Sequence, residues 1–111
     1  MQATIYHNPR CSKSRAALAI LTEAGADITI VEYLKTPLTR HALAALLARA
    51  HLTPRDALRT GEREAGTLKD ADDARILDAM AAHPILIERP IVETARGTLI
   101  ARPPERVREL L

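Results

Sequence analysis

The chain has 111 residues, 47% of them hydrophobic, which is enough for one domain with its own core. Because it has a single cysteine, Cys11, it cannot form an internal disulfide, which argues against a disulfide-stabilised secreted protein. The 16 Lys and Arg are spread among 14 Asp and Glu, and Phe and Trp are absent, so the sequence lacks the basic block and aromatic surface of nucleic-acid binders.

The N-terminal part predicts a strand, a helix and a second strand. Ala3–Tyr6 alternates apolar with polar residues, as a half-buried strand does. A helix from about Ser12 to Ala24 follows, and Gly25 is a suitable residue to end it. Asp27–Tyr33 predicts the second strand, parallel to the first because a helix connects them. The apolar face of the helix recurs at helical spacing and consists of Ala17, Leu18, Leu21 and Ala24.

The middle of the chain predicts three helical segments. The first begins after Thr39, a candidate N-cap, and the second at Thr53–Asp56, a capping box with proline at the first helical position. The third begins near Asp72 and stops before Pro84. The apolar stripes are Leu43, Leu46, Leu47 and Ala50 in the first segment, and Ile76, Leu77, Met80 and Ala81 in the third.

The C-terminal part predicts a hairpin and a last helix. Ile91–Thr94 and Thr98–Ala101 are short apolar strands, and the residues between them, Ala95–Gly97, suit a tight turn. Two prolines, Pro103 and Pro104, are expected to open the final helix.

The order of these elements predicts the fold. Removing a helical insertion at about 39–83 leaves strand, helix, strand, strand, strand and helix, which is typical of the thioredoxin-like fold. We therefore expect one α/β domain over residues 1–111. Its four-stranded mixed sheet carries the insertion between the second and third strands.

The segment Tyr6–Arg15 places Cys11 where the first strand gives way to the first helix. The backbone N–H groups of the first helical turn and the helix dipole favour an anion at this position. The side chains expected to favour the thiolate further are His7, Arg10, Lys13, Ser14 and Arg15. The surroundings therefore predict a reactive thiol and a pocket for a tetrahedral oxyanion, whereas an inert buried cysteine is more typical of an apolar run.

The same segment resembles the signature of the glutaredoxin-coupled, ArsC-like arsenate reductase family. Members of this family begin with a strand, a His-Asn-Pro loop and a Cys-X-X-Ser-Arg helix start. The likeness extends over nearly the whole chain and is closest to the short branch of the family. The further matching blocks, in order, are Pro37, His83–Leu86, Glu88–Val92 and Arg102–Glu105.

The resemblance implies an oxidoreductase in which Cys11 attacks arsenate, with Ser14 at the helix start. The histidine that promotes ionisation of the thiol in this family matches His7. The three arginines that bind the oxyanion match Arg59, Arg89 and Arg102, and a planar, permanently charged guanidinium suits a doubly charged oxyanion. Arg55 and Arg63 compete with Arg59, because the loop at 60–66 is shorter than the family's.

The lone thiol also bears on the expected partners. Arsenate reduction takes two electrons, and one cysteine supplies only half of a disulfide, so further thiols must come from outside. The resemblance implies glutathione as co-substrate and glutaredoxin as partner, with a mixed disulfide between Cys11 and glutathione, no bound cofactor, and phosphate or sulfate as mimics of arsenate. It also implies a cis peptide bond before Pro90.

Two other functions fit the same fold. One is a related thiol–disulfide or deglutathionylating enzyme with another oxyanion or a peptide as substrate. The other is an Spx-type regulator that docks on RNA polymerase. Those regulators typically carry Cys-X-X-Cys, and Ser14 in the fourth position precludes such a disulfide switch.

The remaining features predict no further site and no membrane attachment. His41, His51 and His83 share no metal-ligand spacing, so we interpret them as surface or capping residues. No segment resembles a signal peptide or reaches the length of a membrane span, so we expect a cytoplasmic protein.

Overall fold

A computed structural model describes residues 1–111, which form two compact units. The sheet unit comprises Met1–Thr36 and Arg89–Leu111, and the helical unit comprises Pro37–Glu88. No helix in either unit combines the length and the apolar character needed to cross a bilayer.

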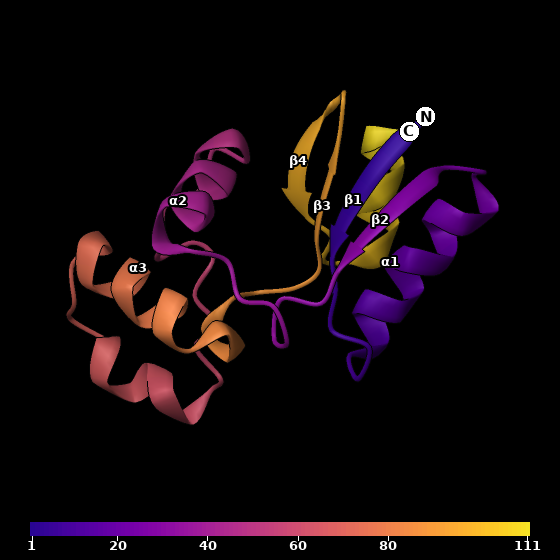
Figure 1. The fold of residues 1–111 in the computed structure, drawn as a ribbon. Coiled ribbons are helices and arrows are strands. Elements are labelled where there is room, and N and C mark those ends of the chain that lie inside the picture. The colour runs from indigo at the N-terminus through magenta and orange to yellow at the C-terminus, as the bar shows by residue number, and fades with distance from the viewer. The chain divides into compact units, whose positions relative to one another are not determined.

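The sheet unit is built on four strands in the order β2-β1-β3-β4 (Figure 1). β1 and β2 run parallel, whereas β3 is antiparallel to both of its neighbours. This is the mixed four-stranded sheet of the thioredoxin-like fold, which confirms the predicted fold class. The elements of the unit are β1 (Gln2–Tyr6), α1 (Ser12–Glu23), β2 (Asp27–Val31), β3 (Ile91–Thr94), β4 (Gly97–Ile100) and the 3₁₀ helix η3 (Pro104–Leu110).

One apolar core joins the sheet to α1 and η3. Ala3 and Ile5 are two residues apart in β1, so both project to the same face of the sheet. Ala17 and Leu21 are four residues apart in α1, so they lie on one side of the helix and bury that side in the same core. The buried members of the core are Ala3, Ile5, Ala17, Leu21, Val92, Leu99, Ala101, Val107 and Leu110.

Three predicted elements of the sheet unit differ from the observed ones. β2 ends at Val31 rather than Tyr33, β4 is Gly97–Ile100 rather than Thr98–Ala101, and the final helix is a 3₁₀ helix. α1 ends as predicted, because Gly25 adopts a φ of 74°, a left-handed conformation that residues with a side chain rarely adopt. Both Arg89–Pro90 and Arg102–Pro103 are cis peptide bonds, the first of which the resemblance implies.

The strand register gathers three loops at one end of the sheet. Tyr6, the last residue of β1, pairs with Ile91, the first residue of β3. Ile91 in turn pairs with Ile100, the last residue of β4. The segments that leave these positions, around His7, Arg89 and Arg102, therefore begin at the same end of the sheet.

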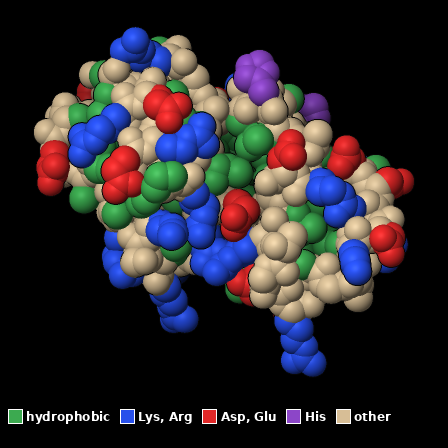
Figure 2. All heavy atoms as spheres, turned by 180° about the vertical axis from the view of Figure 1, so that it is seen from behind, with side chains coloured by type: hydrophobic (Ala, Val, Ile, Leu, Met, Phe, Trp, Pro, Cys, Tyr) green, Lys and Arg blue, Asp and Glu red, His purple; other side chains and the backbone are tan.

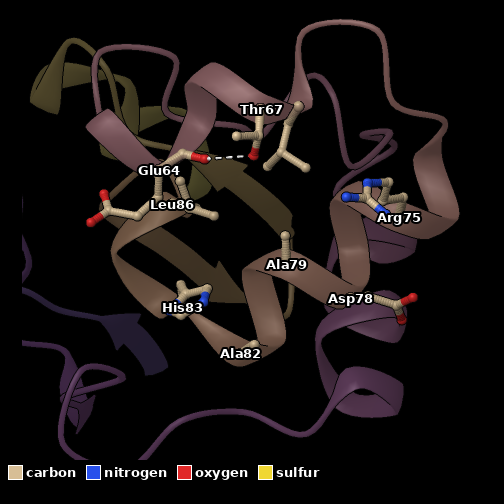
Figure 3. A pocket seen from close by; sticks show the side chains of 9 residues that line it. Glu64, Thr67, Arg75, Asp78, Ala79, Ala82, His83 and Leu86 are labelled. Atoms are coloured by element: carbon tan, nitrogen blue, oxygen red, sulfur yellow. Dashed lines mark hydrogen bonds between the residues drawn. The ribbon is translucent and has the colours of Figure 1, made fainter.

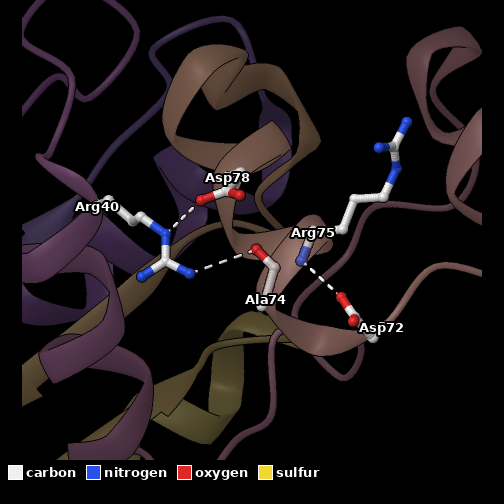
Figure 4. Close-up of polar contacts among 5 residues, drawn as sticks. All are labelled: Arg40, Asp72, Ala74, Arg75 and Asp78. Atoms are coloured by element: carbon white, nitrogen blue, oxygen red, sulfur yellow. Dashed lines mark hydrogen bonds and ion pairs between the residues drawn. The ribbon is translucent and has the colours of Figure 1, made fainter.

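The helical unit contains two α-helices with side-chain caps. Thr39 caps α2 by accepting a hydrogen bond from the Ala42 N–H at 3.0 Å, and Asp72 caps α3 by accepting one from the Arg75 N–H at 2.9 Å (Figure 4). The sequence predicted the cap at Thr39 and a helix that starts near Asp72 or Asp73. The elements are α2 (Arg40–Arg49), the 3₁₀ helices η1 (Arg63–Leu68) and η2 (Pro84–Leu86), and α3 (Asp73–Ala82).

The predicted helix at Thr53 does not form. The capping box itself is present, since the Thr53 N–H donates to Asp56 Oδ2 at 2.9 Å and the Asp56 N–H to Thr53 Oγ1 at 3.1 Å. However, Leu58 is buried and pairs with Ile87 in an isolated β-bridge. The tertiary contact thus stops the segment after a single turn, because a residue in a β-bridge cannot continue a helix.

We predict that Thr39→Ala lowers the free energy of unfolding by about 1 kcal/mol, because the Ala42 N–H loses its partner. Thr39→Asp retains an acceptor at the same position and serves as the matched control, expected within a few tenths of a kcal/mol of wild type. Urea unfolding of the three proteins measures this. Equal losses in both variants would show that the cap contributes nothing.

Candidate active site

Cys11 is the N-cap residue of α1. Its backbone is extended, with φ −89° and ψ 122°, and its side chain makes no capping hydrogen bond. The preceding loop fixes this position, since the Cys11 N–H donates to the Asn8 carbonyl at 3.0 Å and the Arg15 N–H donates to the Cys11 carbonyl at 3.0 Å. The half-buried thiol therefore sits at the positive end of the helix, as the sequence predicts.

Ser14 is fully buried, and its hydroxyl ties the loop to the helix. Ser14 Oγ is hydrogen-bonded to Nδ1 of His7 at 2.6 Å and accepts the Asn8 N–H at 3.1 Å. Ser14 and His7, both predicted to favour the thiolate, are thus hydrogen-bonded to each other in the segment that carries Cys11.

Burial lowers the pKa of His7 below its usual 6.5, the charge of Glu32 opposes this shift, and Arg15 adds to it. The net lowering favours the neutral imidazole at neutral pH. His7 is therefore better suited to holding Ser14 and the loop than to providing a positive charge beside the thiol.

Asn8, which was not among the predicted site residues, holds the loop before Cys11 in place. Its Oδ1 accepts the Arg10 N–H at 3.0 Å, and its own backbone joins both Ser14 and Cys11. Side-chain oxygens of asparagine commonly accept from the backbone two residues on. The Asn-Pro pair was the available signal, because such pairs favour turns.

The cations near the thiol differ in what they contact. Arg15 Nη1 donates to the Pro9 carbonyl at 2.9 Å, so this side chain braces the loop. The side chains of Arg10 and Lys13 are exposed and make no hydrogen bond or ion pair. Arg10 in the loop and Lys13 in the first turn of α1 are therefore two uncommitted positive charges near Cys11 in the sequence.

Arg89 and Arg102 lie together at the loop end of the sheet. Arg102 Nη1 donates to the Arg89 carbonyl at 3.1 Å, while the Ala101 N–H donates to the Pro90 carbonyl at 2.9 Å. The Arg89 side chain is buried, with 7% exposed, and its Nε and Nη1 atoms have no hydrogen-bond partner. A buried guanidinium in this state is costly, and an oxyanion is the group that would satisfy it.

Arg59 belongs to the helical unit and is paired there. Its Nη1 lies 2.8 Å from Glu62 Oε1, and its Nε lies 4.0 Å from Glu88 Oε1. Its competitor Arg55 is committed to backbone carbonyls, including that of Leu68 at 3.3 Å. Neither residue thus shows the unpartnered donors that Arg89 has.

A cavity of about 530 Å³ lies within the helical unit and contains none of the predicted site residues (Figure 3). Leu68, Ala79 and Leu86 contribute an apolar lining. At its margin, Asp78 accepts a hydrogen bond from Arg40, which also donates to the Ala74 carbonyl at 3.4 Å (Figure 4). Arg40 and Asp78 therefore join α2 to α3 at this margin.

Together these observations define a thioredoxin-like protein with one thiol at the start of its first helix and a buried, unpartnered arginine at the same end of the sheet. The chain belongs to the ArsC family, whose profile matches residues 6–110.

Similar proteins include arsenate reductases from several bacteria. The chain is 46% identical to arsenate reductase of Rhizobium meliloti (strain 1021) over 115 residues, covering 100% of this chain and 82% of the relative. It is 45% identical to arsenate reductase of Escherichia coli (strain K12) over 112 residues, covering 97% and 79%. The structure of arsenate reductase from Vibrio cholerae superposes with a TM-score of 0.93 at 39% identity, covering 100% of this chain and 98% of that one.

The lowered pKa of His7 predicts a pH dependence of stability. Between its folded pKa and 6.5, the unfolded chain binds a proton at His7 that the folded chain resists, so the free energy of unfolding rises with pH in that window. Above 6.5 this contribution is constant. His7→Gln should flatten the slope, whereas the control His41→Gln, at an exposed histidine, should not.

Urea unfolding from about pH 5 to about pH 7 measures these slopes. A proton NMR titration of the His7 ring in the wild-type protein is an independent readout. A midpoint at or above 6.5 would contradict the neutral, buried histidine.

Proposed function

We propose that this protein is an arsenate reductase in which Cys11 is the nucleophile and Arg89 and Arg102 bind the oxyanion. Arsenate carries a charge near −2 at neutral pH and presents several oxygens to a pair of guanidinium groups. The single observation that carries the proposal is the buried Arg89 side chain with its unpartnered Nε and Nη1. The assignment of Arg59 to oxyanion binding rests on the resemblance to the family alone.

The proposed roles of the remaining residues follow from their contacts. The N-terminus of α1 favours the thiolate of Cys11 and an anion beside it. Ser14, His7 and Asn8 act as positioning residues, because their hydrogen bonds fix the loop that presents the thiol. Family membership and the relatives' activity support this interpretation over a regulator or a general thiol–disulfide enzyme.

The proposed reaction needs one external thiol to release arsenite and a second to regenerate Cys11. The Cys11 thiolate forms a bond to arsenic and water leaves. Glutathione then attacks the Cys11 sulfur, so that the sulfur–arsenic bond breaks, its electron pair reduces arsenic from +5 to +3, and arsenite leaves. The product is a mixed disulfide between Cys11 and glutathione, and a glutaredoxin thiol attacks it to regenerate Cys11. No bound cofactor takes part.

We predict arsenate-dependent consumption of NADPH when the protein is coupled to glutathione, glutaredoxin and glutathione reductase. Cys11→Ser should lose at least about a thousandfold in rate, because serine cannot form the sulfur–arsenic bond. Ser12→Ala, next to it on the exposed surface, is the matched control and should retain the activity. A wild-type protein that matches Cys11→Ser with arsenate, but reduces a glutathionylated peptide, would assign the general thiol–disulfide function instead.

The unpartnered Arg89 predicts anion-dependent stability. Sulfate at tenfold its Kd should raise the free energy of unfolding of the wild-type protein by about 1.4 kcal/mol. Arg89→Met removes a buried unpaired charge, so it should be as stable as wild type without anion, yet gain nothing from sulfate.

The control for ionic strength is Arg108→Gln, at an exposed position of η3, which should respond to sulfate as wild type does. Thermal unfolding in matched concentrations of sulfate and chloride measures the difference. Equal stabilisation of Arg89→Met and wild type by sulfate would place the anion elsewhere.

A further inference from the structure

The two exposed cations beside Cys11 lack any carboxylate to neutralise them. Neither Arg10 nor Lys13 makes a side-chain hydrogen bond or ion pair. Glu23 is the first acidic residue of the chain, so no carboxylate accompanies them in the N-terminal segment. The charge of Glu32 raises the pKa of His7 against the effect of burial. Glu32 is already paired, because its Oε1 lies 3.5 Å from Lys35 Nζ.

Other exposed cations without a side-chain partner have acidic residues close to them in the sequence. Each lies within four residues of an Asp or Glu. These cations are Arg63, Lys69, Arg75 and Arg108. Figure 2 shows Lys and Arg side chains spread over the surface, several of them toward its lower edge. Arg10 and Lys13 differ from the other exposed cations without a side-chain partner in having no acidic residue near them in the sequence.

Helix stability does not account for this arrangement. The first turn of a helix favours acidic residues, because the dipole is positive there. α3 follows this rule with Asp73 in its first turn, whereas the first turn of α1 has no acidic residue and carries Lys13 and Arg15. α2 also lacks an acidic residue in its first turn, but its Arg40 pairs with Asp78. Arg15 braces the loop through the Pro9 carbonyl, but Arg10 and Lys13 have no such structural contact.

We propose that Arg10 and Lys13 bind the carboxylates of glutathione as its sulfur approaches Cys11. The inference rests on the proposed function, in which an external thiol must reach this residue. Glutathione has two carboxylates, one at each end of a molecule of three residues that spans roughly 10 Å when extended. Arg10 precedes Cys11 directly, Lys13 follows it two residues later, and both side chains are exposed, so both are available to a molecule that approaches the sulfur.

The size of the effect follows from the exposure of both cations. Exposed ion pairs are weak, so each substitution should change glutathione binding by about two- to fivefold, and both together by about tenfold. Salt should screen the interaction. The apparent KM for glutathione should therefore rise with sodium chloride in the wild-type protein and much less in the double variant.

Thiol–disulfide exchange tests the proposal without arsenate. The reduced protein is mixed with oxidised glutathione, which gives the Cys11–glutathione disulfide and one glutathione, and in parallel with 2-hydroxyethyl disulfide, which is uncharged. The ratio of the two rates cancels any change in the reactivity of Cys11 itself. In the Arg10→Gln, Lys13→Gln double variant this ratio should fall about tenfold, and in the control Arg108→Gln it should stay at the wild-type value.

Steady-state kinetics then separates this proposal from the proposed function. The double variant should raise the KM for glutathione about tenfold while changing the KM for arsenate less than about twofold. Parallel increases in both KM values, or an unchanged exchange ratio, would overturn the subsite. A wild-type protein that reduces no arsenate, yet shows the expected exchange ratios, would overturn the proposed function and leave the glutathione subsite supported.

Discussion

The pairing of Tyr6 with Ile91, and of Ile91 with Ile100, is the constraint on which the candidate site depends. Because this register sets where β1 and β4 end and where β3 begins, the loops that carry Cys11, Arg89 and Arg102 leave the sheet at the same end. A slip of one residue would turn every side chain of a strand to the opposite face, so the buried core of Ala3, Ile5, Val92 and Leu99 holds the register.

The same end of the sheet carries charged groups that lower the stability of the folded protein. A buried guanidinium with two unpartnered nitrogen atoms disfavours folding, and cations at the start of a helix oppose its dipole. Under the proposed function, a bound oxyanion would make both features favourable. In the helical unit, α2 and α3 have side-chain caps, and Arg40 at the start of α2 is paired with Asp78.

Around the thiol, the residues that position the loop differ from the residues that carry positive charge. Ser14, His7 and Asn8 form a buried hydrogen-bond group that fixes the loop, and burial favours the neutral form of His7. The charge is supplied instead by arginine and lysine side chains and by the helix terminus. The hydrogen bonds thus hold the loop without using the exposed cations, and the proposed reaction, which needs an external thiol, would leave those cations available to a second molecule.

The sequence by itself determined the fold class, the position of Cys11 at a helix start and the cap at Thr39, because strand alternation, helical spacing and capping are local properties. Only the tertiary structure decided that the Thr53 capping box leads to no helix, since a β-bridge at Leu58 overrides the local preference. It also decided that Ser14 bonds to His7, and that Arg89 is buried without a partner whereas Arg59 is paired. Those outcomes depend on which distant segments meet, and spacing along the chain does not encode them.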